Sequence, residues 1–235
     1  MAKDAVAPLL ARGAFAPVKR LVLNAGMPRS GSSWLYNVQK LVLEAITPPE
    51  DFSHHWIADL TADTKLTPVT LIKVHAYHPQ LAQRASEIVY SYRDVRDALA
   101  SRARFTGKSQ ALGEASYYIR HDRRWRECAG CLIRYEDLRA DADAVVRAVA
   151  KALGAETVDF AAIKASLAGV SEEYRRSKHI THGGTGTWDQ SLTPEVVSAI
   201  ELRHHDWLEE NGYPVSPRAL SPWDRLRRSW WSVFG

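Results

Sequence analysis

The sequence is poor in cysteine and has no long apolar run, and each absence excludes a class of protein. Cys128 and Cys131 are its two cysteines, too few for the disulfide framework of a small secreted domain. No stretch approaches the roughly twenty apolar residues that a membrane-spanning helix needs. The first residues place Asp4 early and do not resemble a secretory signal peptide. These features predict a cytoplasmic protein.

A strong excess of charge of one sign is also missing. Lys and Arg number 31 against 27 Asp and Glu, which gives a formal net charge of +4. This modest value suits a small anionic ligand and falls short of a nucleic-acid-binding surface, so we expect no nucleic-acid partner. The histidines at 54–55 and at 75 and 78 come without a second cluster of ligands, and we therefore predict no metal site.

Length and composition fit one ordinary globular domain, because 235 residues with 46% hydrophobic content are enough for a full core. Residues 1–18 show no sustained periodicity and are predicted to be a loosely held lead-in. The domain itself is expected over residues 19–220. Residues 221–235 mix Arg with Trp and Phe. This tail is predicted to pack onto the body or, alternatively, to touch an anionic membrane surface weakly.

What the sequence does contain is a loop suited to an anion. The apolar run 21–23 predicts a strand, and a helical pattern of apolar residues begins at Trp34. Residues 26–33 between them carry Gly, three serines and Arg29. A Gly-rich loop that opens a helix offers unpaired backbone N–H groups, and Arg29 adds a fixed cation. We therefore interpret this segment as a phosphate-binding loop; the alternative is an ordinary helix start capped by serine.

The loop is not that of ATP-binding proteins, since it lacks the Gly-Lys-Ser/Thr that contacts phosphate and Mg²⁺ there. The run Pro28-Arg29-Ser30-Gly31-Ser32-Ser33-Trp34 resembles instead the phosphosulfate-binding loop of the sulfotransferase family. In that family the second position is Lys or Arg, and the last is Trp or Leu.

A second strand is predicted over residues 69–75, where a β-branched run ends in polar residues. Side chains two positions apart share one face of a strand, so Lys73 and His75 point the same way at its carboxyl end. Ligands of open α/β sheets lie at that end. We therefore expect both side chains beside the phosphate-binding loop.

A third strand, 87–92, leads into a helix that Asp94 is expected to cap. Arg93 leaves the strand, and Ser101 lies two helical turns later. The sequence from Tyr92 to Ser101 resembles the 3′-phosphate motif of sulfotransferases, with its Arg and, eight positions on, its Ser.

Two later segments are also similar to the family. A fourth strand is predicted from Cys131, ending in the turn Tyr135-Glu136-Asp137-Leu138, and helices are expected over 141–153 and over 158–167, the second stopped by Gly169. Residues 177–195 resemble the family's Arg-Lys-Gly loop, which is followed by a helix start at 193–195. Thr181 and His182 stand where the family commonly has Arg and Lys. Other residues must therefore supply part of the positive charge that binds the phosphate.

The resemblance implies a three-layer α/β/α domain with a central parallel sheet, related to P-loop NTPases. It implies transfer of a sulfuryl group from 3′-phosphoadenosine 5′-phosphosulfate (PAPS), without a required metal. The side chains implied in the transfer are Arg29, Lys73 and His75, with His75 as general base. The donor-binding residues implied are Arg29, Ser30, Gly31, Ser32, Ser33, Trp34, Arg93, Ser101, Tyr135, His182, Gly183 and Gly184.

The acceptor is not indicated by any motif, and a saccharide, a lipid or a small molecule with a hydroxyl or amine fits equally. Residues 51–65 are polar, with His54, His55 and Trp56 among them. They are predicted to contact the acceptor or to form a surface loop with a packed Trp. The alternatives for the whole chain are an ATP-dependent kinase of related fold, against which the missing Gly-Lys-Ser/Thr counts, and a nucleotide-binding protein without turnover.

Overall fold

The computed structural model describes residues 6–61, 63–107, 112–176 and 184–216, without the side chains of 170–176. The predictions for residues 221–235, for His182 and Gly183, and for the substitution at Thr181 lie outside these ranges.

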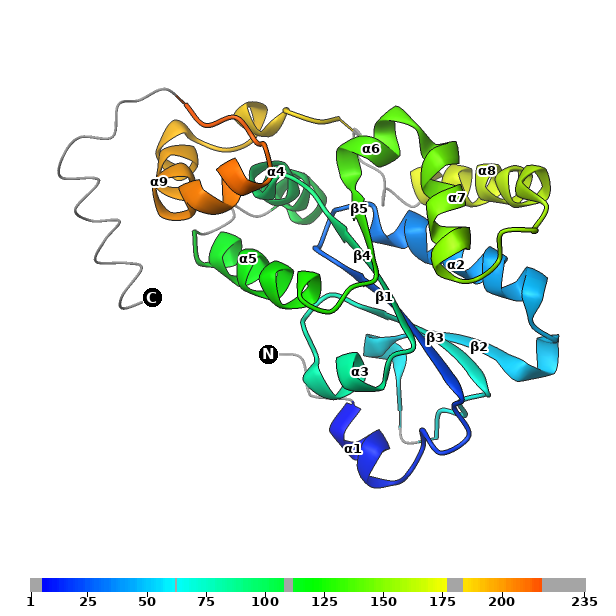
Figure 1. Cartoon of the computed structure of the whole chain (residues 1–235). Helices are drawn as coiled ribbons and strands as arrows, with labels where there is room; N and C mark the ends of the chain where they lie inside the picture. Colours follow the sequence, from blue (N-terminus) through cyan, green and yellow to red (C-terminus); the bar gives the residue numbers. More distant parts are fainter. Residues whose placement is uncertain (1–5, 62, 108–111, 177–183, 217–235) are drawn as a thin grey trace. The chain divides into compact units, whose positions relative to one another are not determined.

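A parallel sheet of five strands forms the centre of the described chain, in the order β2-β3-β1-β4-β5 (Figure 1). The strands are β1 Arg20–Gly26, β2 Phe52–Trp56, β3 Val69–Val74, β4 Glu87–Tyr92 and β5 Cys131–Arg134. All neighbouring pairs are parallel. The predicted parallel sheet is confirmed. β1 is its central strand, so the loop that follows β1 opens at the middle of the sheet's carboxyl edge.

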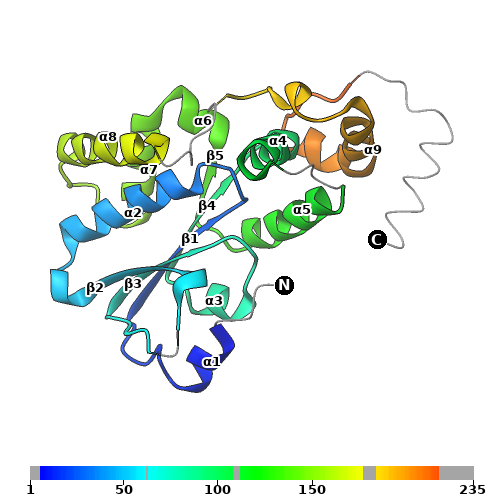
Figure 2. The same cartoon turned by 180° about the vertical axis from the view of Figure 1, so that it is seen from behind.

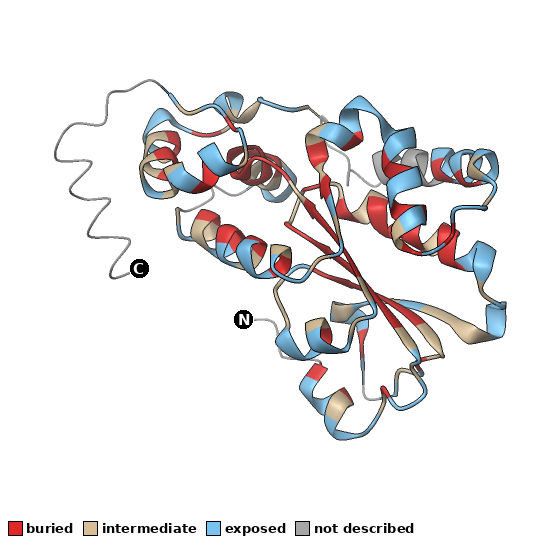
Figure 3. Ribbon diagram, in the orientation of Figure 1, coloured by how far each residue is buried: buried red, intermediate tan, exposed pale blue. Residues whose placement is uncertain are grey.

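Helices cover both faces of this sheet (Figures 1 and 2). α2 Ser32–Ile46, α7 Ala142–Ala152 and α8 Phe160–Arg176 lie on one face; α1 Val6–Ala11 and α3 Pro79–Arg84 lie on the other. Successive residues of β1 alternate between the faces: Val22 joins the core under α2, whereas Leu21 and Leu23 join the core under α1. The inner strands β1, β3 and β4 are accordingly buried on both sides (Figure 3). This is the expected three-layer α/β/α arrangement.

The chain divides into two compact units. The first comprises residues 1–93 and 121–180 and contains the sheet. The second comprises residues 94–120 and 181–235; its described elements include α4 Val95–Thr106, the 3₁₀ turn Trp188–Gln190 and α9 Pro194–Glu210. α5 Leu112–Arg126 runs from the second unit into the first. The predicted domain end at residue 220 lies outside the described ranges and stays a prediction.

Two predicted helix starts are confirmed. Asp94 is the N-cap of α4, where its carboxylate accepts a hydrogen bond of 2.9 Å from the amide of Arg96. α9 begins at Pro194 after Thr193, although the Thr193 side chain makes no capping bond. Proline suits this first position, since its missing N–H has no partner there in any case.

Four local predictions were wrong. Residues 6–11 of the supposed loose lead-in form α1, whose Val6 and Leu9 are 0% and 1% exposed, because the sheet needs apolar cover on that face. The polar segment 51–65 is not simply a surface loop, because it contains the edge strand β2; its alternative role in contacting the acceptor stays a prediction. The turn at 135–138 is the start of a helix, α6 Tyr135–Ala140. α8 continues through Gly169, which is exposed; a helical Gly costs only about 1 kcal/mol there.

Candidate active site

The loop after β1 requires glycine at its first position. A Cβ on Gly26 would lie 2.5 Å from Ser91 Oγ and 2.7 Å from Ser32 Cβ. Ser91 belongs to the neighbouring strand β4 and Ser32 to the first turn of α2. The absence of a side chain therefore lets the turn from β1 into α2 lie directly against β4.

Two residues of the loop have left-handed backbone conformations, Arg29 with φ 68° and Gly31 with φ 80°. Gly31 adopts this geometry without strain, whereas Arg29 is strained in it. Backbone strain of this kind is common at functional sites. Left-handed residues before a helix turn successive amides toward one point and form an anion-binding nest. α2 begins at Ser32, so the amides of its first turn point to the same place.

The serines of the loop do not cap α2. The N-cap is Gly31, and no side-chain capping bond is made. The buried hydroxyl of Ser30 instead hydrogen-bonds the Met27 carbonyl at 2.7 Å and Ser91 Oγ at 2.7 Å. The interpretation of this segment as an ordinary serine-capped helix start is therefore wrong. Ser30 fixes the shape of the loop with its side chain.

Lys73 is almost fully buried at the end of β3, with 3% of its surface exposed. Its ammonium donates a hydrogen bond to Ser33 Oγ in the first turn of α2. Burial, and to a lesser degree the positive charge of Arg29, lowers the pKa of Lys73 to about 7. β3 thus places a cation directly beside the loop, as the sequence predicted.

His75 follows β3 and is exposed, but its orientation is fixed from two sides. Its Nδ1 lies 2.7 Å from the carbonyl oxygen of Gly26. A carbonyl only accepts, so Nδ1 carries the proton of this bond, and in the neutral ring Nε2 carries the lone pair. The backbone carbonyl of His75 accepts a bond of 3.0 Å from Trp125 Nε1. The loop therefore selects the tautomer in which Nε2 is the basic atom.

Arg93 lies where β4 ends and is 3% exposed. Its Nη1 donates to the Arg29 carbonyl at 3.1 Å, and its guanidinium lies 4.1 Å from the centre of the Tyr135 ring. Tyr135 and Leu138 also pack against the loop, because a Cβ on Gly31 would meet Leu138 Cδ2 at 2.7 Å and Tyr135 Cδ2 at 3.2 Å. The predicted residues Arg29, Gly31, Arg93 and Tyr135 therefore form one contiguous cluster.

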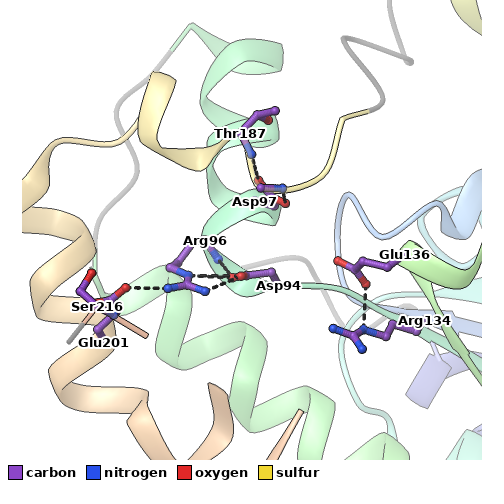
Figure 4. A network of polar contacts seen from close by, with 9 residues as sticks. Asp94, Arg96, Asp97, Arg134, Glu136, Thr187, Glu201 and Ser216 are labelled. Atoms are coloured by element: carbon purple, nitrogen blue, oxygen red, sulfur yellow. Dashed lines mark hydrogen bonds and ion pairs between the residues drawn. The ribbon is translucent and has the colours of Figure 1, made fainter. Parts of the chain in front are cut away.

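In the second unit, α4 contacts residues 186 and 187 of the segment that resembles the family's Arg-Lys-Gly loop (Figure 4). The Asp97 carboxylate accepts bonds of 2.7 Å from the Gly186 amide and 3.0 Å from the Thr187 amide. Ser101, one turn later on α4, is buried. Ser101 was predicted from the sequence and Asp97 was not, although both belong to the same motif.

A buried ion pair lies next to that contact. Arg96 is 0% exposed and bonds Asp94 at 2.6 Å and Glu201 of α9 at 2.6 Å, while its guanidinium lies 4.6 Å from the Trp188 ring centre (Figure 4). Such a pair is strongly destabilising to break from one side, since the partner charge stays buried. Arg96 therefore reads as a structural residue of the second unit.

The structure distributes the predicted site residues as follows. The first unit holds Arg29, Ser30, Gly31, Ser32, Ser33, Trp34, Lys73, His75, Arg93 and Tyr135; the second holds Ser101 and Gly184. Trp34 is half-buried and packs against the core on the α2 face. Trp56 was not predicted as a site residue, but its ring centre lies 4.0 Å from Lys73 Nζ. Only the pairing of β2 with β3 reveals this contact.

Within the described ranges, one group of three potential metal ligands gathers, namely His205, Asp206 and Glu209 on α9. Their ligand atoms lie within 4.8 Å of one another, and His205 Nδ1 is 3.0 Å from Glu209 Oε2. Both carboxylates are largely exposed. Acidic groups at a surface commonly gather without an ion, so this group does not by itself indicate a metal centre. None of the helices in the described part is long and apolar enough to cross a membrane.

Comparison with known proteins gives a family and a fold. A family model described as a sulfotransferase domain matches residues 19–212. No curated protein sequence matches the chain. Among solved structures, mouse sulfotransferase SULT7A1 complexed with PAP is similar, with a TM-score of 0.60 and 16% identity over 98% of this chain and 96% of that one.

Retinol dehydratase is also similar in fold. Its complex with androsterone and the inactive cofactor PAP has a TM-score of 0.56 and 16% identity, over 90% of this chain and 88% of that one. Its complex with retinol and PAP has the same TM-score and identity, over 90% and 87%. The two complexes therefore agree on the fold.

Proposed function

The chain belongs to the sulfotransferase family, because the family model covers residues 19–212, and on this premise we propose that it transfers a sulfuryl group from PAPS to an acceptor hydroxyl or amine. Membership confirms the family that the motifs predicted. The donor and the residue roles below are our proposal, and PAP in the similar structures supports the choice of donor.

One observation carries the proposal. β3 brings Lys73 and His75 into contact with the loop after β1, Lys73 through Ser33 Oγ and His75 through the Gly26 carbonyl. A cation and a base thus meet at the carboxyl edge of the sheet, where ligands of open α/β folds bind. A serine-capped helix start would need neither group.

We assign the 5′-phosphosulfate to the loop. The left-handed residues Arg29 and Gly31 and the first turn of α2 present backbone amides, and the helix dipole favours negative charge there. Arg93, held by the Arg29 carbonyl, is our candidate for the 3′-phosphate. Tyr135 and Trp34 are our candidates for flanking the adenine. Ser101, Gly184 and the residues at 182–183 complete the predicted set.

The chemistry then follows the logic of in-line group transfer, in which the protein mainly positions the reactants and neutralises charge. The acceptor oxygen forms a bond to sulfur as the bond from sulfur to the 5′-phosphate oxygen breaks. The electron pair of the broken bond stays on the phosphate oxygen, and the nucleotide product is 3′-phosphoadenosine 5′-phosphate (PAP). The acceptor proton goes to Nε2 of His75, which Gly26 holds in the accepting tautomer.

Positive charge is needed where the transferring and leaving oxygens become more negative. Lys73 and Arg29 are the cations that we assign to this role. Arg29 stands where many relatives have Lys; its planar fork grips two oxygens and is always protonated. Proton transfer is therefore left to His75, and charge stabilisation to the two cations.

For the acceptor we propose a small molecule that carries a hydroxyl or an amine. The similar structures of retinol dehydratase hold androsterone and retinol. For this chain a saccharide or a lipid headgroup stays an alternative, since no described contact selects among them.

The experiment that tests the function offers sulfur-35-labelled PAPS to panels of phenols, sterols, saccharides and amines, with wild type and with Lys73→Met. We expect label in an acceptor with wild type and a large loss with the variant. A parallel arm offers γ-labelled ATP with Mg²⁺. Transfer of phosphate with no transfer of sulfate would replace the proposal with a kinase.

A further inference from the structure

Trp56 and Lys73 are directly paired across the edge of the sheet. In the register of β2 with β3, Trp56 is the partner of Lys73, so the two side chains leave the sheet on the same face. Lys73 Nζ lies 4.0 Å from the centre of the Trp56 ring. The Tyr36 ring of α2 borders the same space, 6.0 Å from Nζ and edge-on to Trp56.

The environment of Lys73 makes this aromatic face important. An ammonium that is 3% exposed has lost most of its water, and burial of a charge is costly unless something replaces the water. Among the residues that the structure describes, no carboxylate pairs with Lys73, and its one hydrogen-bond partner is the neutral Ser33 hydroxyl. Arg29 adds repulsion. The face of an indole attracts a cation, and more strongly where water is excluded.

We propose that Trp56 is a positioning residue, which holds the Lys73 ammonium at the loop through the face of its indole. The contact stabilises the charged form of Lys73 and points it toward Ser33. Its consequence for sulfuryl transfer rests on the proposed function; the contact itself does not. Trp56 is 37% exposed at the end of an edge strand, so its replacement leaves the core intact.

The direction in which the pKa of Lys73 changes in a Trp56 variant depends on whether water reaches the ammonium. Loss of the aromatic face disfavours the charged form and lowers the pKa of Lys73 further below its ordinary range, whereas entry of water would raise it. Trp56→Phe and Trp56→Leu are therefore compared with each other, because both shorten the side chain to a similar volume and one keeps a ring. Other titratable groups nearby are Arg29 of the loop, His75 after β3, and Tyr36 of α2, whose hydroxyl bonds His54 of β2.

The primary measurement is the titration of Lys73 itself, by NMR of protein with isotope-labelled lysine side chains and no donor. The Lys73 signal is identified by its absence in Lys73→Arg. We expect its midpoint to be lower in Trp56→Leu than in Trp56→Phe, by about one pH unit. Equal midpoints in the two variants would overturn the proposal.

A second series keeps the shape of the side chain constant. Fluorinated tryptophans, placed site-specifically at position 56, weaken the negative face of the ring stepwise without shortening it. The midpoint of Lys73 should fall with each added fluorine. The matched control places the same residues at position 207, where Trp207 is 1% exposed and stacks on Tyr213, and where no effect on Lys73 is expected. If the Lys73 midpoint did not change with fluorination at position 56, Trp56 would act by packing alone, and the proposed contact through the face of its ring would be wrong.

The functional consequence is measured by PAP affinity against pH. If wild type binds PAP, its affinity should fall as the pH rises and Lys73 loses its proton, because only protonated Lys73 attracts the 5′-phosphate. This fall should begin at a lower pH in Trp56→Leu than in Trp56→Phe. If wild type does not bind PAP while the NMR series behaves as expected, the proposed donor is wrong and the Trp56 contact stands. PAP binding with identical pH profiles in both variants would instead refute the positioning role.

Discussion

His75 is held so that one ring nitrogen donates to the chain, which leaves Nε2 as the basic atom of the neutral ring and as the proton acceptor that we propose. The Gly26 carbonyl occupies Nδ1, and Trp125 fixes the backbone. We expect His75→Asn to lower single-turnover sulfuryl transfer by about 10²- to 10⁴-fold, the usual contribution of a general base, and to leave PAP affinity nearly unchanged.

The matched control for that variant is His78→Asn. His78 lies three residues further along and precedes α3 as its N-cap. Near-normal turnover is expected for it. If His75→Asn were folded and fully active while His78→Asn lost the rate, the base would be misassigned.

Arg93 supports a second prediction at this scale. Its guanidinium is held by the Arg29 carbonyl and the Tyr135 ring, close to the loop. Arg93→Ala should weaken PAP binding by about 10- to 100-fold, since a charge-assisted phosphate contact is worth roughly 1.5–3 kcal/mol. Calorimetry with PAP and with adenosine 5′-phosphate measures this. An equal loss for both nucleotides would place Arg93 away from the 3′-phosphate.

At the scale of elements, the loop from β1 to α2 depends on Gly31. Alanine there meets a left-handed φ of 80° and the side chains of Tyr135 and Leu138. We expect Gly31→Ala to reduce the free energy of unfolding by about 1–3 kcal/mol, in urea titrations, and to weaken PAP binding as well.

Gly130→Ala is the matched control for the loop. A Cβ there meets nothing within 4 Å, and the position is exposed. Its stability should stay within about 0.5 kcal/mol of wild type. Equal stability of the Gly31 variant and this control would mean that the loop adapts freely and is not the rigid nest that we describe.

The elements that the sequence revealed are those with a continuous local pattern. β1, β3 and β4 are buried on both faces and read as apolar runs. β2 was missed because it is an edge strand: its residues are half-buried or exposed, and three of the five are polar. α1 was missed because its Ala- and Pro-rich stretch has too few turns to show a period.

The same distinction holds for the candidate site. Lys73 and His75 were identifiable because two positions on one strand share a face. Trp56 was not, since its contact with Lys73 depends on the register between two strands that no local pattern encodes. Asp97 was overlooked because its partners are backbone amides 89 and 90 residues away.

At the scale of the whole molecule, the order of motifs along the chain identified the family, and the fold agrees with it. The candidate donor site was identified only in part. Arg93 belongs to the first unit and Ser101 to the second, so their joint role at one phosphate stays a prediction. No motif of the sequence indicates the acceptor, and no described contact identifies it.

The central claim is that this chain binds the PAPS skeleton, and a thermal-shift comparison of PAP with ATP plus Mg²⁺ tests it most directly. A ligand that binds only the native state raises the melting temperature by mass action. Wild type should be stabilised more by PAP than by ATP plus Mg²⁺, and most of the PAP effect should vanish in Arg93→Ala. A larger shift with ATP plus Mg²⁺ would contradict the account and favour a kinase.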